Sequence, residues 1–285
     1  LLEGFSIMLQ VKKVLNNNVL IAIHPSYNEV ILTGKGIGFG KKPGENISSE
    51  KAEKFFVLKN EKEQQQYKQL LDYVDESFIG LMNECMEKIE KRLYVQLNEH
   101  IHVGLTDHLY FAVKRIQQGI DIKNPFLNET ESAYPKEYSV AMEVVNWLNK
   151  KLNIDIPEGE VGFIALHIHS ALTNRDISEI NRHTQLINEL VQIIEISLNI
   201  KIDRKDVNYL RLVHHFHCSI ERISEGNIPS EKQETLAKVL QNEYPVCYNL
   251  AWKLIKIMQQ KLQKPVPDEE AVYITLHLQR LSKQQ

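Results

Sequence analysis

The sequence contains no apolar run that approaches the ~20 residues a helix needs to span a bilayer. Its start, Leu1-Leu2-Glu3-Gly4, also lacks the basic and then apolar segments of a secretory signal. We interpret residues 1–7 as a leader or a remnant and place the natural start at Met8. These absences favour a cytoplasmic protein without membrane insertion.

Cysteine is scarce, and the motifs of metal and hydrolytic sites are missing. Cys85, Cys218 and Cys247 are odd in number and far apart, which argues against a disulfide framework and a zinc site and fits a reducing cytosol. His-x-His pairs occur at 100/102, 167/169 and 215/217, but residues two apart on a helix point away from each other. With no HExxH motif and no serine elbow, we expect no metal, no cofactor and no catalytic residue.

The charge is unevenly distributed along the chain. Residues 8–60 carry eight lysines and four acids, a balance of +4, which leaves −7 for the rest of a chain whose net charge is −3. A basic head on an acidic body indicates a polyanionic partner, although chance clustering of solvated lysines would give the same count. The length of 285 residues suits two or three domains.

Residues 8–60 predict a small antiparallel sheet. Turn sequences (HPSYN and GKGIGFGKKPGEN) separate short β-branched runs. The expected strands are Val11–Leu15, Val19–Ile23, Glu29–Thr33 and Phe55–Leu58. About 50 residues of sheet bury little apolar surface, so we expect this domain to form a homodimer. Residues 61–66 (EKEQQQ) are the expected linker, and helical apolar spacing follows them.

The rest of the chain contains an internal repeat. LTDHLYFAVKRI (105–116) matches LVHHFHCSIERI (212–223), YPKEYSVA (134–141) matches YPVCYNLA (244–251), and KLNIDIPEGEVGFIALHI (151–168) matches KLQKPVPDEEAVYITLHL (261–278). Three blocks in one order predict two copies of one helical domain, residues 67–171 and 172–285, each with its own core. The expected fold class is therefore multidomain, a small antiparallel β domain followed by two homologous all-α helical bundles.

Each copy places histidine at the same two positions: His108 aligns with His215, and His167 aligns with His277. A lone histidine on an apolar helix is commonly a packed core residue, but packing alone does not select histidine twice in two copies. Since metal and triad motifs are missing, the remaining chemistry is acceptance of a phosphoryl group by the imidazole. That exchange of a near-neutral ring for a dianion is enough to rearrange an interface. Asp107 could help to orient the His108 ring.

The loop GKGIGFGKK (34–42) is not a nucleotide-binding loop, because it has neither GxGxxG spacing nor a GK(S/T) ending. It presents Lys35, Lys41, Lys42 and Phe39 on a flexible backbone. Lysines with an interleaved aromatic residue suit single-stranded or looped RNA. The alternative is a glycine-rich hairpin that buries Phe39 in the core.

Three asparagines interrupt the apolar run VLNNNVLIA (14–22). We predict that Asn16, Asn17 and Asn18 form the turn between the first two strands, since asparagine tolerates unusual φ and ψ. Their amides could donate to and accept from RNA. A purely structural asparagine turn is the alternative.

Together, VKKVLNNNVLIA (11–22), GKGIGFGKK and the doubled histidine blocks resemble bacterial transcriptional antiterminators of the BglG/SacY type. The resemblance covers residues 8–281 and is strongest to the glucose-operon members. It implies an RNA-binding domain with a four-stranded sheet, active as a homodimer, and two domains regulated by the sugar phosphotransferase system. The implied RNA contacts are Lys13, Asn16, Asn17, Asn18, Gly34, Lys35 and Phe39.

The resemblance also implies partners. The RNA is an imperfect hairpin in leader mRNA that overlaps an intrinsic terminator, so binding lets polymerase continue into sugar-transport genes. By the same resemblance, we expect the sugar-specific enzyme II to phosphorylate His108 and His167 when sugar is absent, and the phosphocarrier HPr to modify His215 and His277, as it modifies the corresponding positions in many relatives. The second copy departs from the pattern, because Val-His-His (213–215) replaces Thr-Asp-His (106–108) and His217 follows. His214 or His217 is therefore an alternative acceptor.

Two other classes of protein remain as alternatives. A DNA-binding activator with the same regulatory domains would need a helix-turn-helix, and residues 8–60 contain no amphipathic helix long enough for one. A metal-dependent hydrolase built on the His-x-His pairs would bind zinc stoichiometrically.

Overall fold

The computed structural model describes residues 7–52, 54–56, 61–120, 122–226 and 233–283. The chain forms two compact units. The first comprises residues 1–122, 140–160 and 167–174, and the second comprises residues 123–139, 161–166 and 175–285. Within the described ranges, no helix combines the length and the apolar composition that a membrane crossing requires.

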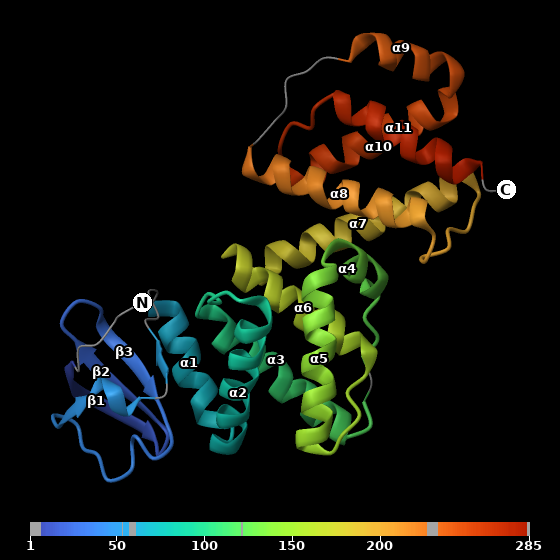
Figure 1. Ribbon diagram of the computed structural model, residues 1–285. Helices are drawn as coiled ribbons and strands as arrows, with labels where there is room; N and C mark the ends of the chain where they lie inside the picture. The colour runs from blue at the N-terminus through green and yellow to red at the C-terminus, as the bar shows by residue number, and fades with distance from the viewer. Residues whose placement is uncertain (1–6, 53, 57–60, 121, 227–232, 284–285) are drawn as a thin grey trace. The chain divides into compact units, whose positions relative to one another are not determined.

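A small antiparallel sheet opens the first unit, as the sequence predicted (Figure 1). Its strands follow the order β4-β1-β2-β3-β5. The bounds are β1 (Met8–Asn16), β2 (Val19–His24), β3 (Asn28–Thr33), β4 (Asn46–Ser48) and β5 (Lys54–Phe56). Five strands replace the four implied by the resemblance, because three-residue β4 is too short to show a period. The strand expected at 55–58 is β5, and its expected last residues, 57 and 58, lie outside the described residues.

The sheet has its own apolar core. It consists of Leu9, Val11, Leu20, Ala22, Val30, Leu32, Ile37 and Ile47. Val19, Ile21 and Ile31, which alternate with these residues, are also buried, so β2 and β3 are covered on both faces. Ile7, assigned to the leader by the sequence, belongs to this fold. Its N–H donates to Ser49 Oγ at 3.1 Å, and its carbonyl accepts from Ser49 N–H at 2.9 Å.

No α-helix occurs in the described part of the head, where the one helical element is a 3-10 turn at Ser49–Lys51. The described head therefore lacks the helix-turn-helix that a DNA-binding activator would need.

The helices of the first unit are α1 (Glu61–Tyr73), α2 (Glu76–Leu93), α3 (His100–Gln117), most of α5 (Pro135–Leu152) and both ends of α6 (Glu158–Thr173). Phe78, Met82, Met86 and Ile89 recur at helical spacing on α2 and are buried. The expected linker at residues 61–66 forms the beginning of α1, so this connection is helical.

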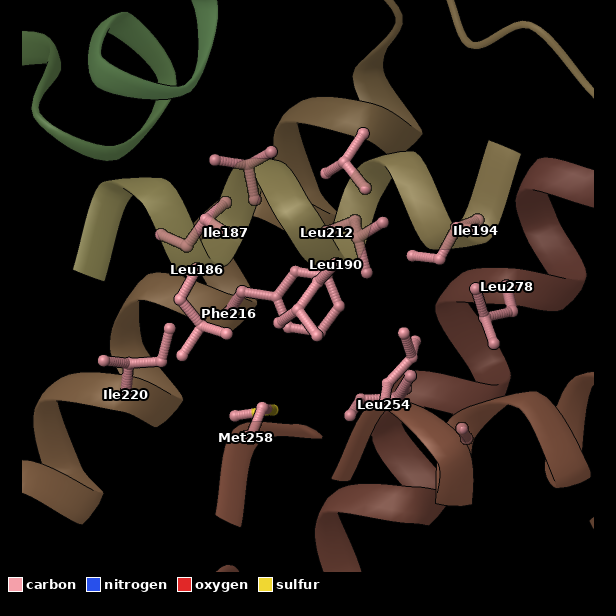
Figure 2. Close-up of a cluster of buried hydrophobic side chains, with 14 of the residues drawn as sticks. Leu186, Ile187, Leu190, Ile194, Leu212, Phe216, Ile220, Leu254, Met258 and Leu278 are labelled. Atoms are coloured by element: carbon pink, nitrogen blue, oxygen red, sulfur yellow. The ribbon is translucent and has the colours of Figure 1, made fainter. Parts of the chain in front are cut away.

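The second unit contains α4 (Leu127–Ala133), α7 (Ile177–Leu198), α8 (Val207–Glu225), α9 (Glu234–Glu243), α10 (Pro245–Leu262) and α11 (Glu269–Ser282). Helices α10 and α11 pack against each other, and each contacts α8 and α9 (Figure 1). Helix α8 begins where the Asp206 carboxylate accepts from Asn208 N–H at 2.7 Å, and it ends at Gly226, whose φ is 76°. Leu190, Phe216 and Met258 belong to the apolar cluster that joins these helices (Figure 2).

One segment of the first sequence repeat packs in the second structural unit. Residues 123–139, which comprise the segment before α5 and the beginning of that helix, belong to the first copy by sequence but pack in the second unit. Glu129 on α4 is 2% exposed and accepts from Tyr209 OH at 2.9 Å. Because Tyr209 and Arg204 hold this buried carboxylate from the α8 side, α4 is fixed to the second unit.

Candidate functional site

Asn16, Asn17 and Asn18 form the turn between β1 and β2. Asn16 pairs with Val19 across the hairpin, and its side-chain oxygen accepts from Asn18 N–H at 2.9 Å. None of the three has a positive φ, so unusual backbone angles do not explain the asparagines. The side-chain hydrogen bonds of Asn16 and Asn18 explain these two residues instead.

The glycine-rich loop rests on this asparagine turn. Gly34 N–H donates to the Asn18 carbonyl at 3.0 Å, and Gly36 N–H donates to Asn18 Oδ1 at 2.7 Å. A Cβ on Gly38 would lie 2.2 Å from the Asn16 carbonyl oxygen, so only glycine fits there. Asn16 and Asn18 thus have the structural role that the sequence left as an alternative, and they tie the two predicted RNA-contact segments into one platform.

The platform exposes the side chains that an RNA would need. Phe39 is 76% exposed, so the hypothesis of a core phenylalanine is wrong. Lys35 is exposed on the same loop. Lys13 is exposed on β1, opposite Ile21 and three residues before Asn16. An exposed ring on the same loop as a lysine offers a nucleic acid both a stacking face and a positive charge.

The first histidine pair joins α3 and α6. The rings of His108 and His167 lie with their centroids 5.3 Å apart. His108 Nε2 lies 2.8 Å from Glu160 Oε2, and Arg115 Nη2 donates to Glu160 Oε1 at 3.2 Å. His108 and Arg115 are two helical turns apart on α3, as are Glu160 and His167 on α6, so all four side chains meet at one place.

The second unit repeats the same four residues. The centroids of His215 and His277 are 5.1 Å apart. Arg222 Nη2 donates to Glu270 Oε1 at 2.7 Å, and His215 Nε2 lies 2.9 Å from Glu270 Oε2, within ion-pair distance but out of hydrogen-bond alignment. The sequence identified the four histidines but missed the glutamates and arginines. The signal was present, because each stands at a matched position of a repeated block.

The alternatives to His215 have different surroundings. His214 is exposed, and its Nε2 lies 3.5 Å from Cys218 Sγ. The His217 ring packs edge-on against Tyr134 at 4.8 Å. His215 alone among the three reproduces the geometry of His108. Asp107 accepts a hydrogen bond from Tyr73 OH, so Glu160 rather than Asp107 orients the His108 ring.

His167 on α6 and His277 on α11 are the inner histidines of the two pairs, and His108 and His215 are the outer ones. Burial and neighbouring charges keep the inner histidines neutral. Burial, together with the neighbouring His108 and His100, lowers the pKa of His167 to about 3. Burial, His215 and two arginines lower the pKa of His277 to about 4. Burial raises the pKa of Glu160, but His108 and Arg115 outweigh it and keep that pKa below its ordinary value. At neutral pH, the rings of His167 and His277 are therefore uncharged, which is the nucleophilic form of imidazole.

A metal centre finds no support in the described residues. No group of three or more histidine, cysteine or acidic side chains is placed there to hold a metal ion. The three His-x-His pairs lie on α3, α6 and α8, where their members point apart.

Comparison with known proteins identifies the domains of the chain. The CAT RNA binding domain family matches residues 9–65, and the PRD domain family matches residues 83–171 and 188–281. The PtsGHI operon antiterminator of Bacillus subtilis (strain 168) is 57% identical over 272 residues, 95% of this chain and 96% of the relative. The chain belongs to the family of CAT–PRD antiterminators.

Other relatives give the same result. The GlcA/glcB genes antiterminator of Staphylococcus carnosus (strain TM300) is 40% identical and covers 96% of each chain. The crystal structure of GlcT CAT-PRDI is 59% identical with a TM-score of 0.54, and it covers 59% of this chain and 99% of that one. The predicted family and fold class, a β RNA-binding domain before helical regulatory domains, are confirmed.

Proposed function

We propose that this CAT–PRD antiterminator binds an RNA hairpin in the leader of a glucose phosphotransferase operon and prevents the terminator from forming. The observation that carries the proposal is the platform, where the asparagine turn and the glycine loop present Lys35 and Phe39 to solvent. The names of its relatives, an antiterminator of the PtsGHI operon and one of the glcA and glcB genes, support glucose as the sugar.

Each part of the platform has a role in RNA recognition. Lys13 and Lys35 neutralise phosphates, the Phe39 ring stacks on an unpaired base, and the amides of Asn16, Asn17 and Asn18 contact base edges or riboses. Gly34, which is buried and donates to the Asn18 carbonyl, positions the loop for the RNA. The protein acts as a cytoplasmic homodimer, so that two platforms meet one imperfect hairpin. It regulates by binding and catalyses no reaction.

Phosphorylation of the histidine pairs controls this binding. When the Nε2–H group of His108 donates a hydrogen bond to Glu160, the nucleophilic lone pair of the ring is on Nδ1. That nitrogen attacks the phosphorus of the donor, the bond between donor and phosphorus breaks, and the ring proton leaves to a base. Enzyme II modifies His108 and His167 in the absence of sugar, which inactivates the protein. HPr modifies His215 and His277.

Equilibrium binding of the full-length protein to the leader hairpin of the neighbouring sugar-transport operon tests the proposal. We expect tight binding to the hairpin, weak binding to a scrambled RNA of equal length, and affinity that falls steeply with salt. Equal affinity for both RNAs, or salt-independent binding, would refute it. A double variant with His108→Ala and His167→Ala should lose the phosphate transferred by a reconstituted permease cascade.

A further inference from the structure

The two histidine pairs share their central residues but differ at the positions beside the inner histidine. The repeat aligns Gly104 with Arg211, and it aligns Ser170 with Arg280. At these two positions the first domain has a glycine and a serine, whereas the second domain has two arginines. This substitution changes the charge around an otherwise repeated site.

In the first domain, small and neutral groups enclose His167. A Cβ on Gly104 would lie 3.3 Å from His167 Nδ1, so the ring packs directly on the backbone of α3. Ser170 Oγ lies 3.1 Å from His100 Nε2. Among the described residues, no lysine or arginine contributes to the lowered pKa of His167.

In the second domain, the two arginines flank His277. Arg211 precedes His215 by one helical turn on α8, and Arg280 follows His277 by one turn on α11, so each shares a face with a histidine of the pair. Both side chains are exposed, and neither has a carboxylate partner among the described residues. Arg222, by contrast, is engaged by Glu270. Burial and His215 lower the pKa of His277, and the positive charges of Arg280 and Arg211 add to this effect.

We propose that Arg211 and Arg280 form, with His277, a site for a phosphoryl dianion that the first domain lacks. Unpaired guanidinium groups are preferred ligands of phosphate oxygens, because they donate two parallel hydrogen bonds and remain charged. The site receives either the phosphoryl group on His277 or free inorganic phosphate, which present the same oxygens. The first alternative rests on the function proposed above, and the second does not.

The consequence is a difference in lifetime between the two modifications. Phosphohistidine hydrolyses when a water oxygen attacks phosphorus, the nitrogen–phosphorus bond breaks, and a proton from water goes to the ring nitrogen. Arg211 and Arg280 stabilise the bound dianion against this attack, whereas His167 has no such support. The modification of the second domain is therefore retained longer than that of the first.

Chemical phosphorylation of the full-length protein with potassium phosphoramidate tests this without the permease. The ring nitrogen displaces ammonia from phosphorus, and the lifetime of phosphohistidine at His277 is then followed by phosphorus NMR and peptide mapping. We expect the R211Q/R280Q variant to lose the phosphoryl group about tenfold faster, the effect of losing one or two charge-assisted hydrogen bonds. The K253Q/K256Q variant removes the same charge from exposed positions of α10. It should lose the phosphoryl group at the same rate as the protein without substitutions.

Titration with inorganic phosphate, followed by the NMR signals of the histidine rings, separates the possible failures. We expect saturable shifts at His277, weakened in R211Q/R280Q and unchanged in K253Q/K256Q. Equal lifetimes and equal phosphate affinities in both double variants would overturn the anion site. If phosphoramidate leaves His277 unmodified while phosphate still binds through the arginines, the proposed acceptor role fails and the anion site stands.

Discussion

His215 and His277 lie with their ring centroids 5.1 Å apart, against 5.3 Å for His108 and His167. In both pairs, one buried glutamate lies beside the outer histidine and accepts from an arginine. The internal repeat therefore preserves a chemical arrangement and not only a helical bundle. In the proposed function, this arrangement is where phosphorylation controls RNA binding by the head.

Replacing Glu160 by glutamine should destabilise the first domain. The change removes the charge that holds His108 and Arg115 at a carboxylate that is 3% exposed, and we expect the free energy of unfolding to fall by about 1–3 kcal/mol. Glu143→Gln is the control, since its pair with Arg92 is half exposed and should contribute less than about 1 kcal/mol. Urea unfolding of both variants measures the difference, and equal losses would contradict the structural role of Glu160.

A methyl group at Gly104 should disturb His167. Its Cβ would lie 3.3 Å from Nδ1, so Gly104→Ala should shift the ring and lower the yield of phosphohistidine at His167. Gly80→Ala on α2 is the matched control, because nothing lies within 4 Å of its Cβ. That variant should gain about 0.5–1 kcal/mol from helix propensity and keep its full yield. Histidine NMR shifts and phosphoramidate labelling give both results, and an unaffected ring in the Gly104 variant would refute the packing.

Stability should fall as the solution is acidified below pH about 6.5. The folded protein holds the pKa of His167 at about 3 and that of His277 at about 4, against an ordinary value of 6.5. The unfolded chain therefore binds more protons in this interval, and the free energy of unfolding decreases with decreasing pH. The slope is at most about 1.4 kcal/mol per pH unit for His167 and smaller for His277, which water partly screens.

Urea unfolding between pH 7.5 and 5 isolates these histidines, since the carboxylates with lowered pKa lose their contribution only below about pH 4.5. The H167Q/H277Q variant should show a shallower decrease. A decrease of the same slope in this variant would assign the effect to other groups.

The ring of Phe39 should contribute to RNA affinity but not to folding. Since it is 76% exposed, Phe39→Ala should weaken hairpin binding by about 1–3 kcal/mol and leave the unfolding transition unchanged. Ile37→Ala makes the complementary comparison, because Ile37 is 6% exposed in the sheet core and its loss should lower stability. Parallel titrations and melts separate the two effects. Loss of stability without a specific loss of affinity in the Phe39 variant would contradict the stacking role.

Much of the fold could be predicted where a sequence pattern extends over enough residues to be recognised. The doubled blocks at 151–168 and 261–278 identify the repeated domains, and the turn sequences around the asparagines locate the first hairpin. Strand β4 escapes prediction because three residues after a glycine- and proline-containing loop show no periodicity. The packing of α4 in the second unit also escapes, because Glu129 meets Tyr209 across 80 residues of sequence.

The sequence predicted the histidines of the candidate site but not the glutamates and arginines that hold them. Glu160 stands seven residues before His167, and that spacing becomes meaningful only when α6 packs against α3. The role of the asparagines was likewise hidden. Asn18 Oδ1 accepts from Gly36 N–H, a contact between segments that no local pattern joins.

Transcription through the leader of the neighbouring sugar-transport operon, with purified polymerase and the full-length protein, tests the central claim most directly. The measured quantity is the fraction of transcripts that extend past the terminator. We predict that this fraction rises with protein concentration and falls again after enzyme II phosphorylates His108 and His167. A fraction that stays constant at saturating protein would contradict the account.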